Sequence, residues 1–434
     1  MWYDGGMERK YLPRVLEPVI ERKLKGKGCV VIEGPKWCGK STTGKRYAKS
    51  VVELAEEKIF KLYQTYFDMG DPSLFMGEKP LMFDEWQAIP GIWDSVKNEV
   101  DRTGLRGQFI LTGSATPPEN PNRHPGTGRI AKLTMRPLSL WESGESTGEI
   151  SLADLFSGSA KIMGSNKHTL NDLAYMTCRG GWPDIMADDQ ETALEAAHDY
   201  VATLISHDLN NQREFKKEFK LDPQRAAAIL KAYARGISQA TKLATLKSDV
   251  DANDDTIDPR TLDTYITAFE RLFVIEDVVA WSPMLRSKAT IRSANTRQFV
   301  DPSIATAALG IAPNDLVADL NTFGFMFESL ATRDLRVYAE SMGGKVYQYH
   351  DSTGLEVDII VHFLTGPMSG KWGAIEVKLG RDDLIEEGAK NLLTLKDKVS
   401  EKSPPSFLMV VTGTKNAYTR PDGVIVVPLA CLKN

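Results

Sequence analysis

The stretch Gly34-Pro-Lys-Trp-Cys-Gly39-Lys40-Ser41-Thr42 decides the fold of the first part of the chain. It matches the pattern G-x-x-x-x-G-K-[ST], follows the apolar run 29–33, which we expect to be a strand, and opens a stretch of helical composition. Glycines let the backbone curl so that successive N–H groups converge on phosphate oxygens, and a helix N-terminus adds partial positive charge. The sequence therefore predicts a phosphate-binding loop.

The residue types in this loop indicate ATP and Mg²⁺ as cofactors. The Lys40 ammonium should reach the β- and γ-phosphates, and the Ser41 hydroxyl should ligate Mg²⁺. A chance glycine loop is the alternative, and the flanking strand and helix disfavour it. We expect the nucleotide to contact the loop residues Gly34, Pro35, Lys36, Gly39, Lys40, Ser41 and Thr42.

Two later strand ends should bring polar groups to the same site. The apolar run from Leu81 ends in Asp84 and Glu85, which resembles a Walker B strand. Asp84 would hold the Mg²⁺ shell, and Glu85 would polarise the attacking water. The strand candidate 108–112 ends close to Thr112 and Ser114, either of which would sense the γ-phosphate unless this segment is a simple turn.

Hydrolysis at such sites usually requires an extra cation, because an arginine finger raises the rate by roughly 10³- to 10⁵-fold. Arg129, which follows Gly126-Thr-Gly128, is our first candidate, and an ordinary surface arginine is the alternative. The sequence does not decide whether Arg129 would act on its own subunit or on a neighbouring one.

Composition excludes several classes of protein. The 434 residues are 42% hydrophobic and 26% charged, which is ordinary for a globular chain with real cores. The net charge of −5 provides no global basic field that would attract nucleic acid or an anionic membrane. Apolar runs fall short of the roughly 20 residues of a membrane helix. Because the four cysteines form no C-x-x-C pair and no signal peptide is visible, we expect a reduced, cytoplasmic compartment and no zinc ribbon.

The pattern of elements predicts four domains. Strands alternate with helical stretches over residues 1–142, which predicts an α/β ATPase core with a mostly parallel sheet. The short run 59–63 is read as one of its strands. Residues 143–212 read as a small helical lid. Helices followed by β-like runs make 213–312 resemble a winged helix, and 313–434 reads as an α+β domain.

The last domain contains a second set of acidic residues. Asp358 begins an apolar strand, and Glu376 and Lys378 lie two residues apart on a later strand, so their side chains should project from the same face. Glu328, on the long helix before these strands, would add a third carboxylate. Carboxylates bind Mg²⁺, and the lysine would position or activate a water. The arrangement resembles the active site of PD-(D/E)XK nucleases; a salt-bridged sheet rim, or an inactive domain used for binding, is the alternative.

A basic stretch lies between Asp277 and Asp301 and would form the wing of the winged helix. Cations on such a hairpin could bind the phosphates of duplex nucleic acid. Alternatively, the hairpin is only solvated, or it forms a contact between domains. The candidate nucleic-acid residues are Arg286, Lys288, Arg292 and Arg297.

The order of motifs resembles a known family over nearly the whole chain. It is similar to prokaryotic AAA-type ATPases that carry a C-terminal domain of unknown function with a restriction-endonuclease-like fold. The resemblance rests on Tyr11-Leu-Pro-Arg14, Gly34-Pro35, Gly39-Lys40-Ser41-Thr42, Phe83-Asp-Glu-Trp-Gln87, Leu111-Thr-Gly-Ser114, Gly128-Arg129, Arg136-Pro-Leu-Ser-Leu-Trp-Glu142, Gly180-Gly-Trp-Pro183, Asp301-Pro302, Phe327-Glu328, Glu356-Val-Asp358 and Ile375-Glu-Val-Lys378.

The resemblance implies ATP and Mg²⁺ at Lys40, Ser41, Asp84 and Glu85, and a nuclease-like fold around Glu328, Asp358, Glu376 and Lys378. The loop interior 36–38 departs from the family pattern, and the arginine-rich sensor of many AAA lids has no clear match. The sequence favours an ATP-hydrolysing protein that couples a nucleotide switch to a Mg²⁺-dependent nuclease-like domain acting on DNA. The alternative is a non-cutting switch that binds nucleic acid or a protein partner. AAA-type ATPases often form rings, so a homo-oligomer is left open.

Overall fold

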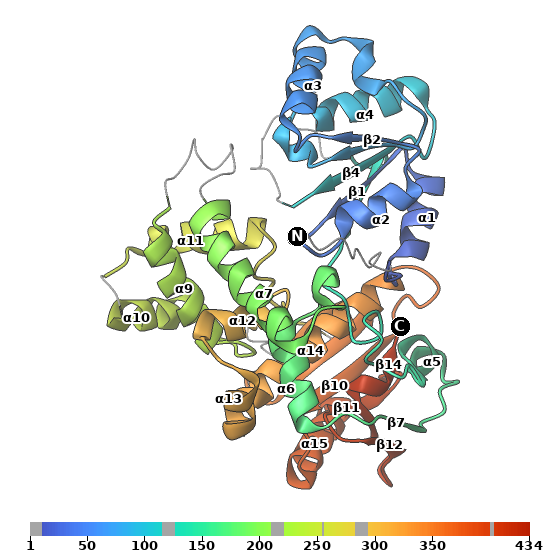
Figure 1. The fold of residues 1–434 in the computed structure, drawn as a ribbon. Coiled ribbons are helices and arrows are strands. Elements are labelled where there is room, and N and C mark those ends of the chain that lie inside the picture. The colour runs from blue at the N-terminus through green and yellow to red at the C-terminus, as the bar shows by residue number, and fades with distance from the viewer. Residues whose placement is uncertain (1–10, 115–125, 210–220, 254–255, 283–293, 400–402) are drawn as a thin grey trace.

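The computed structural model describes residues 11–114, 126–209, 221–253, 256–282, 294–399 and 403–434 (Figure 1). In the view of Figure 1 the blue N-terminal sheet lies at the top, the yellow-green helices α9 (Pro223–Arg235), α10 (Leu243–Asn253) and α11 (Pro259–Arg271) lie on the left, and the orange and red C-terminal sheet lies at the bottom. No helix within the described ranges is both long and apolar enough to cross a bilayer.

The N-terminal sheet is parallel, with strand order β2-β3-β4-β1-β5. Alternate residues of its central strands face two different hydrophobic clusters, as expected for a parallel sheet covered on both faces. The elements are α1 (Glu17–Gly26), β1 (Cys29–Glu33), α2 (Lys40–Tyr47), β2 (Ser50–Glu53), α3 (Glu57–Met69), β3 (Leu81–Asp84), α4 (Ile92–Thr103), β4 (Phe109–Gly113) and β5 (Ile130–Thr134).

The expectation of a strand at 59–63 is wrong, because these residues belong to helix α3. The apolar side chains Ile59, Phe60, Tyr63 and Phe67 recur at helical spacing and pack against the sheet cluster, which a reading of the short run alone does not reveal. Gly70 ends the helix in the left-handed conformation, with φ of 63°.

A largely helical region follows, with one continuous core. Helix α12 contacts both α7 and α9, so the predicted lid and winged-helix regions share buried side chains. The boundary between them stays a prediction. The elements are α5 (Leu152–Ser157), α6 (Leu170–Arg179), α7 (Gln190–Thr203), the π-helical turn η4 (Leu204–Asp208), α9 (Pro223–Arg235), α10 (Leu243–Asn253), α11 (Pro259–Arg271), α12 (Pro302–Leu309) and α13 (Pro313–Ala318).

The β-like runs after α11 form an antiparallel pair through Ile275–Phe299 and Val278–Thr296 bridges. Ala280 then pairs with Gln348 of strand β8, so this pair continues into the edge of the C-terminal sheet. The tip of the predicted wing, 283–293, lies outside the described residues.

The C-terminal sheet has strand order β7-β12-β13-β11-β10-β9-β8. Helix α14 packs on the face that carries Ile375 and Val377, and α15 packs on the face that carries Ala374. Asp358 lies on one strand of this sheet, and Glu376 and Lys378 lie on the neighbouring strand, as the sequence pattern indicates. The elements are β7 (Gly164–Ser165), α14 (Leu320–Ser341), β8 (Gly344–His350), β9 (Glu356–Phe363), β10 (Trp372–Lys378), α15 (Asp382–Lys398), β11 (Leu408–Thr412), β12 (Asn416–Thr419) and β13 (Ile425–Pro428). A separate two-stranded sheet is formed by β6 (Ile150–Ser151) and β14 (Leu432–Lys433).

Candidate functional site

The loop between β1 and α2 adopts a conformation that favours glycine at two points. Gly34 has φ of 153°, and a β-carbon there would lie 2.0 Å from the carbonyl oxygen of Met135. Gly39 has φ of 92° and caps the start of α2. The loop backbone therefore turns sharply between a buried strand and a helix N-terminus, where N–H groups and the helix dipole favour an anion.

The side chains predicted to bind Mg²⁺ are in contact with each other. Ser41 Oγ donates a hydrogen bond to Asp84 Oδ1 at 2.7 Å, and Thr112 Oγ1 donates to the same oxygen at 2.5 Å. Strand β4 lies between β1 and β3, which explains why Thr112 reaches Asp84. A hydroxyl next to a carboxylate is a donor set that suits Mg²⁺, so the residues present fit this ion.

The Lys40 side chain is buried and folds back onto its own loop. Its Nζ donates a hydrogen bond to the carbonyl oxygen of Pro35 at 2.6 Å. The ammonium is thus held within the loop that is predicted to surround the phosphates.

Glu85 lies directly after β3 in the left-handed conformation, with φ of 54°. Ser114 Oγ donates to its Oε2 at 2.9 Å, and Gln87 Nε2 donates to the same oxygen. Ser114 therefore contacts Glu85 in this structure. Sequence reasoning missed Gln87, although its place two residues after the acidic pair made it available to that carboxylate.

A cleft of about 930 Å³ opens over these groups. Its volume lies in the range of small-molecule sites. One wall is the phosphate loop with Glu85 and Ser114, and a second wall comes from the helical region through Pro183, Asp184, His207 and Asp208. The site is therefore shared between two parts of the chain that are far apart in sequence.

The structure places Arg129 away from this cleft, and its role as an arginine finger stays a prediction. Arg129 precedes β5, whose residue Ile130 pairs with Cys29 at the start of β1, whereas the phosphate loop follows the other end of β1. The two ends of such a strand are about 13 Å apart. The Arg129 guanidinium instead pairs with Asp101, Nε to Oδ1, at 2.6 Å.

The four residues of the predicted acidic site come together at one end of the C-terminal sheet. Lys378 Nζ lies 2.7 Å from Glu376 Oε2 and 3.6 Å from Asp358 Oδ2. Asp358 Oδ2 also accepts a hydrogen bond from the backbone N–H of Val377 at 2.8 Å. The Glu376 side chain is 1% exposed, and its Oε2 is a buried oxygen without a regular hydrogen bond.

Burial and the mutual repulsion of these acids change their protonation. Burial, reinforced by the Asp358 carboxylate, holds the pKa of Glu328 and that of Glu376 well above their ordinary range. Burial alone would lower the pKa of Lys378, but the Asp358 and Glu376 carboxylates raise it overall. No three His, Cys, Asp or Glu side chains among the described residues form a metal-binding group. Lys378 lies within ion-pair distance of both strand carboxylates.

Three of the candidate nucleic-acid residues, Arg286, Lys288 and Arg292, lie outside the described residues. Arg297 is described, and its contacts are with protein groups, so its role in nucleic-acid binding stays a prediction. Its side chain is 12% exposed, pairs with Asp277 Oδ2 at 3.0 Å and covers the Tyr233 ring. Arg297 thus joins the β-like runs to helix α9 from within.

Comparison with known proteins agrees with the geometry of the N-terminal site. Residues 26–143 match the family model described as an AAA domain. These residues form a P-loop AAA-type ATPase domain. Residues 170–315 match a domain of unknown function, DUF8612, and residues 323–432 match another, DUF4143. No protein of curated function matches the chain in sequence.

Among solved structures, the chain is similar to a Walker-type ATPase of Pyrococcus abyssi, with 14% identity, a TM-score of 0.44, and coverage of 69% of this chain and 97% of that one. The replication initiator DnaA of Aquifex aeolicus bound to AMPPCP gives 13% identity and a TM-score of 0.21, covering 59% and 86%. Drosophila ORC bound to DNA gives 12% identity and a TM-score of 0.19, covering 71% and 90%.

A polar network joins the AAA domain to the C-terminal domain. Arg14 donates through Nη1 to the Cys38 carbonyl of the phosphate loop at 2.7 Å and pairs through Nε with Glu142 Oε1 at 3.0 Å. The backbone N–H of Leu140 in turn donates to Asp334 Oδ2 of α14 at 3.0 Å.

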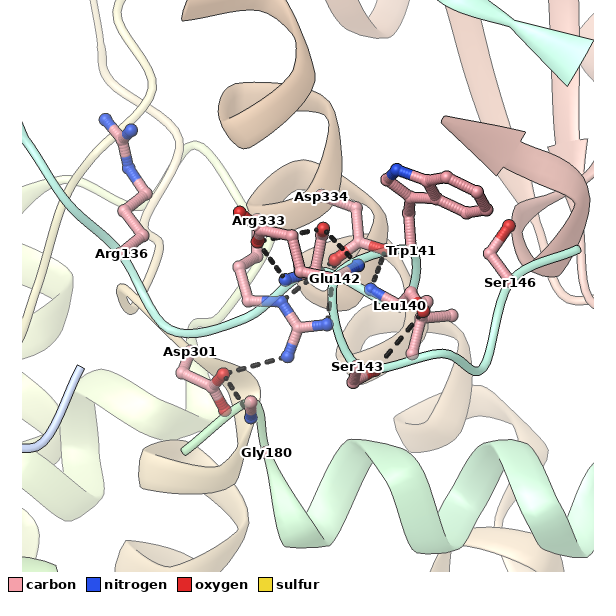
Figure 2. A network of polar contacts seen from close by, with 12 residues as sticks. Arg136, Leu140, Trp141, Glu142, Ser143, Ser146, Gly180, Asp301, Arg333 and Asp334 are labelled. Carbon is pink, nitrogen blue, oxygen red and sulfur yellow. Dashed lines mark hydrogen bonds and ion pairs between the residues drawn. The ribbon is translucent and has the colours of Figure 1, made fainter. Parts of the chain in front are cut away.

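Figure 2 shows Arg333 of α14 between Asp334 and Asp301 in this network. Arg136 extends it by pairing with both Glu276 and Glu340. Helix α14 also carries Glu328, so the network reaches the element that holds part of the acidic site.

Proposed function

We propose that this protein binds and hydrolyses ATP with Mg²⁺ in the AAA-domain cleft. The contact of Ser41 Oγ and Asp84 Oδ1, at 2.7 Å, carries this proposal, because both oxygens sit beside a glycine loop and a helix N-terminus. Ser41 and Asp84 would hold Mg²⁺, which supplies positive charge that offsets the charge on the phosphates. Lys40 would exchange its Pro35 contact for the β- and γ-phosphates, and Glu85 would orient the attacking water.

Phosphate release from Mg²⁺-ATP tests this proposal with Lys40→Ala. The matched control is Lys45→Ala, since Lys45 lies on the same helix but is exposed and pairs with Glu53. The proposal requires turnover or affinity to fall strongly in Lys40→Ala and to stay near wild type in Lys45→Ala. Unchanged nucleotide affinity together with unchanged turnover in Lys40→Ala would rule it out.

We further propose that the C-terminal acidic site is a Mg²⁺-dependent nuclease-like site acting on DNA. Lys378 Nζ lies 2.7 Å from the buried Glu376 Oε2 and 3.6 Å from Asp358 Oδ2, so the three groups are close enough to act on one ligand, which would replace the Lys378 contact of Glu376. The carboxylates would hold Mg²⁺, and Lys378 would position water or offset charge on the phosphorus centre. Residues 323–432 would then have a restriction-endonuclease-like fold.

DNA cleavage in Mg²⁺ or Mn²⁺ tests this second part. Asp358→Ala and Lys378→Ala should each abolish cleavage and leave ATP hydrolysis largely intact, since the two sites lie in separate domains. Lys390→Ala, an exposed substitution on α15, is the matched control. Absence of cleavage of any DNA or RNA by the wild type, with and without ATP, would reject the nuclease function.

One observation favours a second candidate function, a nucleotide switch that binds nucleic acid or a protein without cutting. Lys378 lies within ion-pair distance of both Asp358 and Glu376, and the described residues contain no three-ligand metal group. An ion-paired cluster of this kind can serve structure alone. The same cleavage assay separates the two candidates, because a switch would bind its partner and leave phosphodiesters intact. Assembly into a homo-oligomer stays a proposal for either function.

A further inference from the structure

Both lysines of the phosphate loop already have partners in this structure. Lys40 Nζ donates to the Pro35 carbonyl oxygen at 2.6 Å. Lys36 Nζ pairs with Asp208 Oδ1 at 2.5 Å, across the cleft that the two residues line together. The loop is therefore held by protein acceptors where a nucleotide would offer phosphate oxygens.

Asp208 lies at the end of the π-helical turn η4, which continues helix α7. Its side chain is 6% exposed, and His207 Nδ1 lies 3.3 Å from the same oxygen that contacts Lys36. π-helical turns disrupt regular helix hydrogen bonding and are frequent at functional positions. The carboxylate is thus largely removed from water, and among the described residues Lys36 is the lysine that pairs with it.

The neighbouring residue Trp37 brings the same part of the loop against α7. Its backbone is in the left-handed conformation, with φ of 66°, and its ring centroid lies 6.0 Å from that of Tyr200. Tyr200 stacks on Trp182 at 4.6 Å. The loop interior that departs from the family pattern therefore contacts the DUF8612 region through a charge pair and an aromatic pair.

We propose that Lys36 is a second phosphate-binding cation, and that Asp208 is a positioning residue that holds Lys36 until nucleotide phosphates replace the carboxylate. This inference rests on the proposed nucleotide binding at Lys40. A polyphosphate carries more charge than one carboxylate and would be surrounded by loop N–H groups, so it competes well for the Lys36 ammonium.

Transfer of Lys36 to phosphate has a consequence for the helical region. Asp208 would be left largely buried without its cation, which is costly, so η4 would shift to hydrate the carboxylate. Nucleotide binding would thereby loosen the contact between the AAA domain and the DUF8612 region. The Lys36–Asp208 ion pair thus connects the two regions only while no nucleotide is bound. A purely structural ion pair would persist when nucleotide binds.

Calorimetric titration with ADP and with a non-hydrolysable ATP analogue tests the proposal. Asp208→Asn should tighten nucleotide binding about 5- to 30-fold, because Lys36 no longer has to leave a carboxylate. Lys36→Met should weaken binding about tenfold or more, and Lys36→Arg should retain most of it. In the Lys36→Met background, Asp208→Asn should have no further effect, because the two residues act as one unit.

Asp199→Asn is the matched control, since Asp199 is exposed on α7. Weaker or unchanged binding in Asp208→Asn, with wild-type binding intact, would overturn the inference and leave the proposed function standing. An absence of nucleotide binding by the wild-type protein would overturn both the inference and the proposed function.

A measurement on the wild type keeps the test valid if Asp208→Asn does not fold. Hydrogen exchange of residues 204–208 should become faster when the ATP analogue is bound, because η4 loses its connection to the loop. Slower or unchanged exchange at saturating analogue would contradict the proposal.

Discussion

Glu85→Gln separates chemistry from binding in the AAA domain. Both hydrogen bonds to this carboxylate, from Ser114 Oγ and Gln87 Nε2, go to the single oxygen Oε2. A glutamine can place its amide oxygen there and keep both bonds, so the loop geometry and the nucleotide affinity should change by no more than a few-fold. What the substitution removes is the charge that orients water, and a general base contributes roughly 10²- to 10⁴-fold in rate.

The expected loss corresponds to about 2.7–5.4 kcal/mol in activation free energy, at about 1.36 kcal/mol per tenfold. Single-turnover phosphate release at saturating Mg²⁺-ATP measures it, and calorimetry with an ATP analogue checks affinity. Glu57→Gln is the control, because Glu57 also lines the cleft but is exposed and pairs with Lys61. A Glu85→Gln protein that binds poorly yet turns over each bound ATP at the wild-type rate would refute this role.

Three other substitutions or conditions follow from the packing. Gly34→Ala should abolish nucleotide binding in calorimetry, because φ is 153° and the new β-carbon would lie 2.0 Å from a carbonyl oxygen. Burial alone would raise the pKa of Glu276, but Arg136 lowers it from 4.5 to about 2, so the stability from this pair is complete above about pH 4.5 and is lost as pH falls toward 2. Unfolding followed by circular dichroism measures the fall in the free energy of unfolding between about pH 4.5 and 2. This fall should be about 1–3 kcal/mol smaller in Glu276→Gln than in the wild type. Arg14→Met should lower the thermal midpoint, because the buried Glu142 carboxylate then has lost its ion-pair partner. Adding Glu142→Gln removes that unpaired charge and should recover part of the lost midpoint. A further loss in the double variant, equal to the sum of the two single losses, would contradict this.

The parts of the site that sequence predicted are those fixed by local backbone chemistry. The glycine loop, the apolar strand that ends in Asp84, and the spacing of Glu376 and Lys378 each constrain side-chain direction within a few residues. The structure brings Ser41 to Asp84 and Asp358 to Lys378 as these patterns indicate. Their chemical roles stay predictions.

The parts that sequence could not give depend on contacts between distant segments. Arg129 follows a glycine turn like a finger residue, but only the pairing of β5 with β1 shows that it lies at the end of these strands opposite the phosphate loop. Arg297 belongs to a basic stretch, yet Asp277 and Tyr233 enclose it. Asp208 carries no sequence signal, because its partner in the loop becomes visible only when α7 packs against the AAA domain.

One reaction that reports phosphate release and phosphodiester cleavage together tests the central claim, that one chain couples an ATP site to a C-terminal cutting site. Wild-type protein is incubated with supercoiled or linear DNA and Mg²⁺, with ATP, with a non-hydrolysable analogue, or without nucleotide. The account predicts phosphate release with ATP, and cleavage that requires Asp358 and changes in rate with the nucleotide supplied. Cleavage that survives Asp358→Ala, or ATP turnover without cleavage of any DNA under all three conditions, would contradict it.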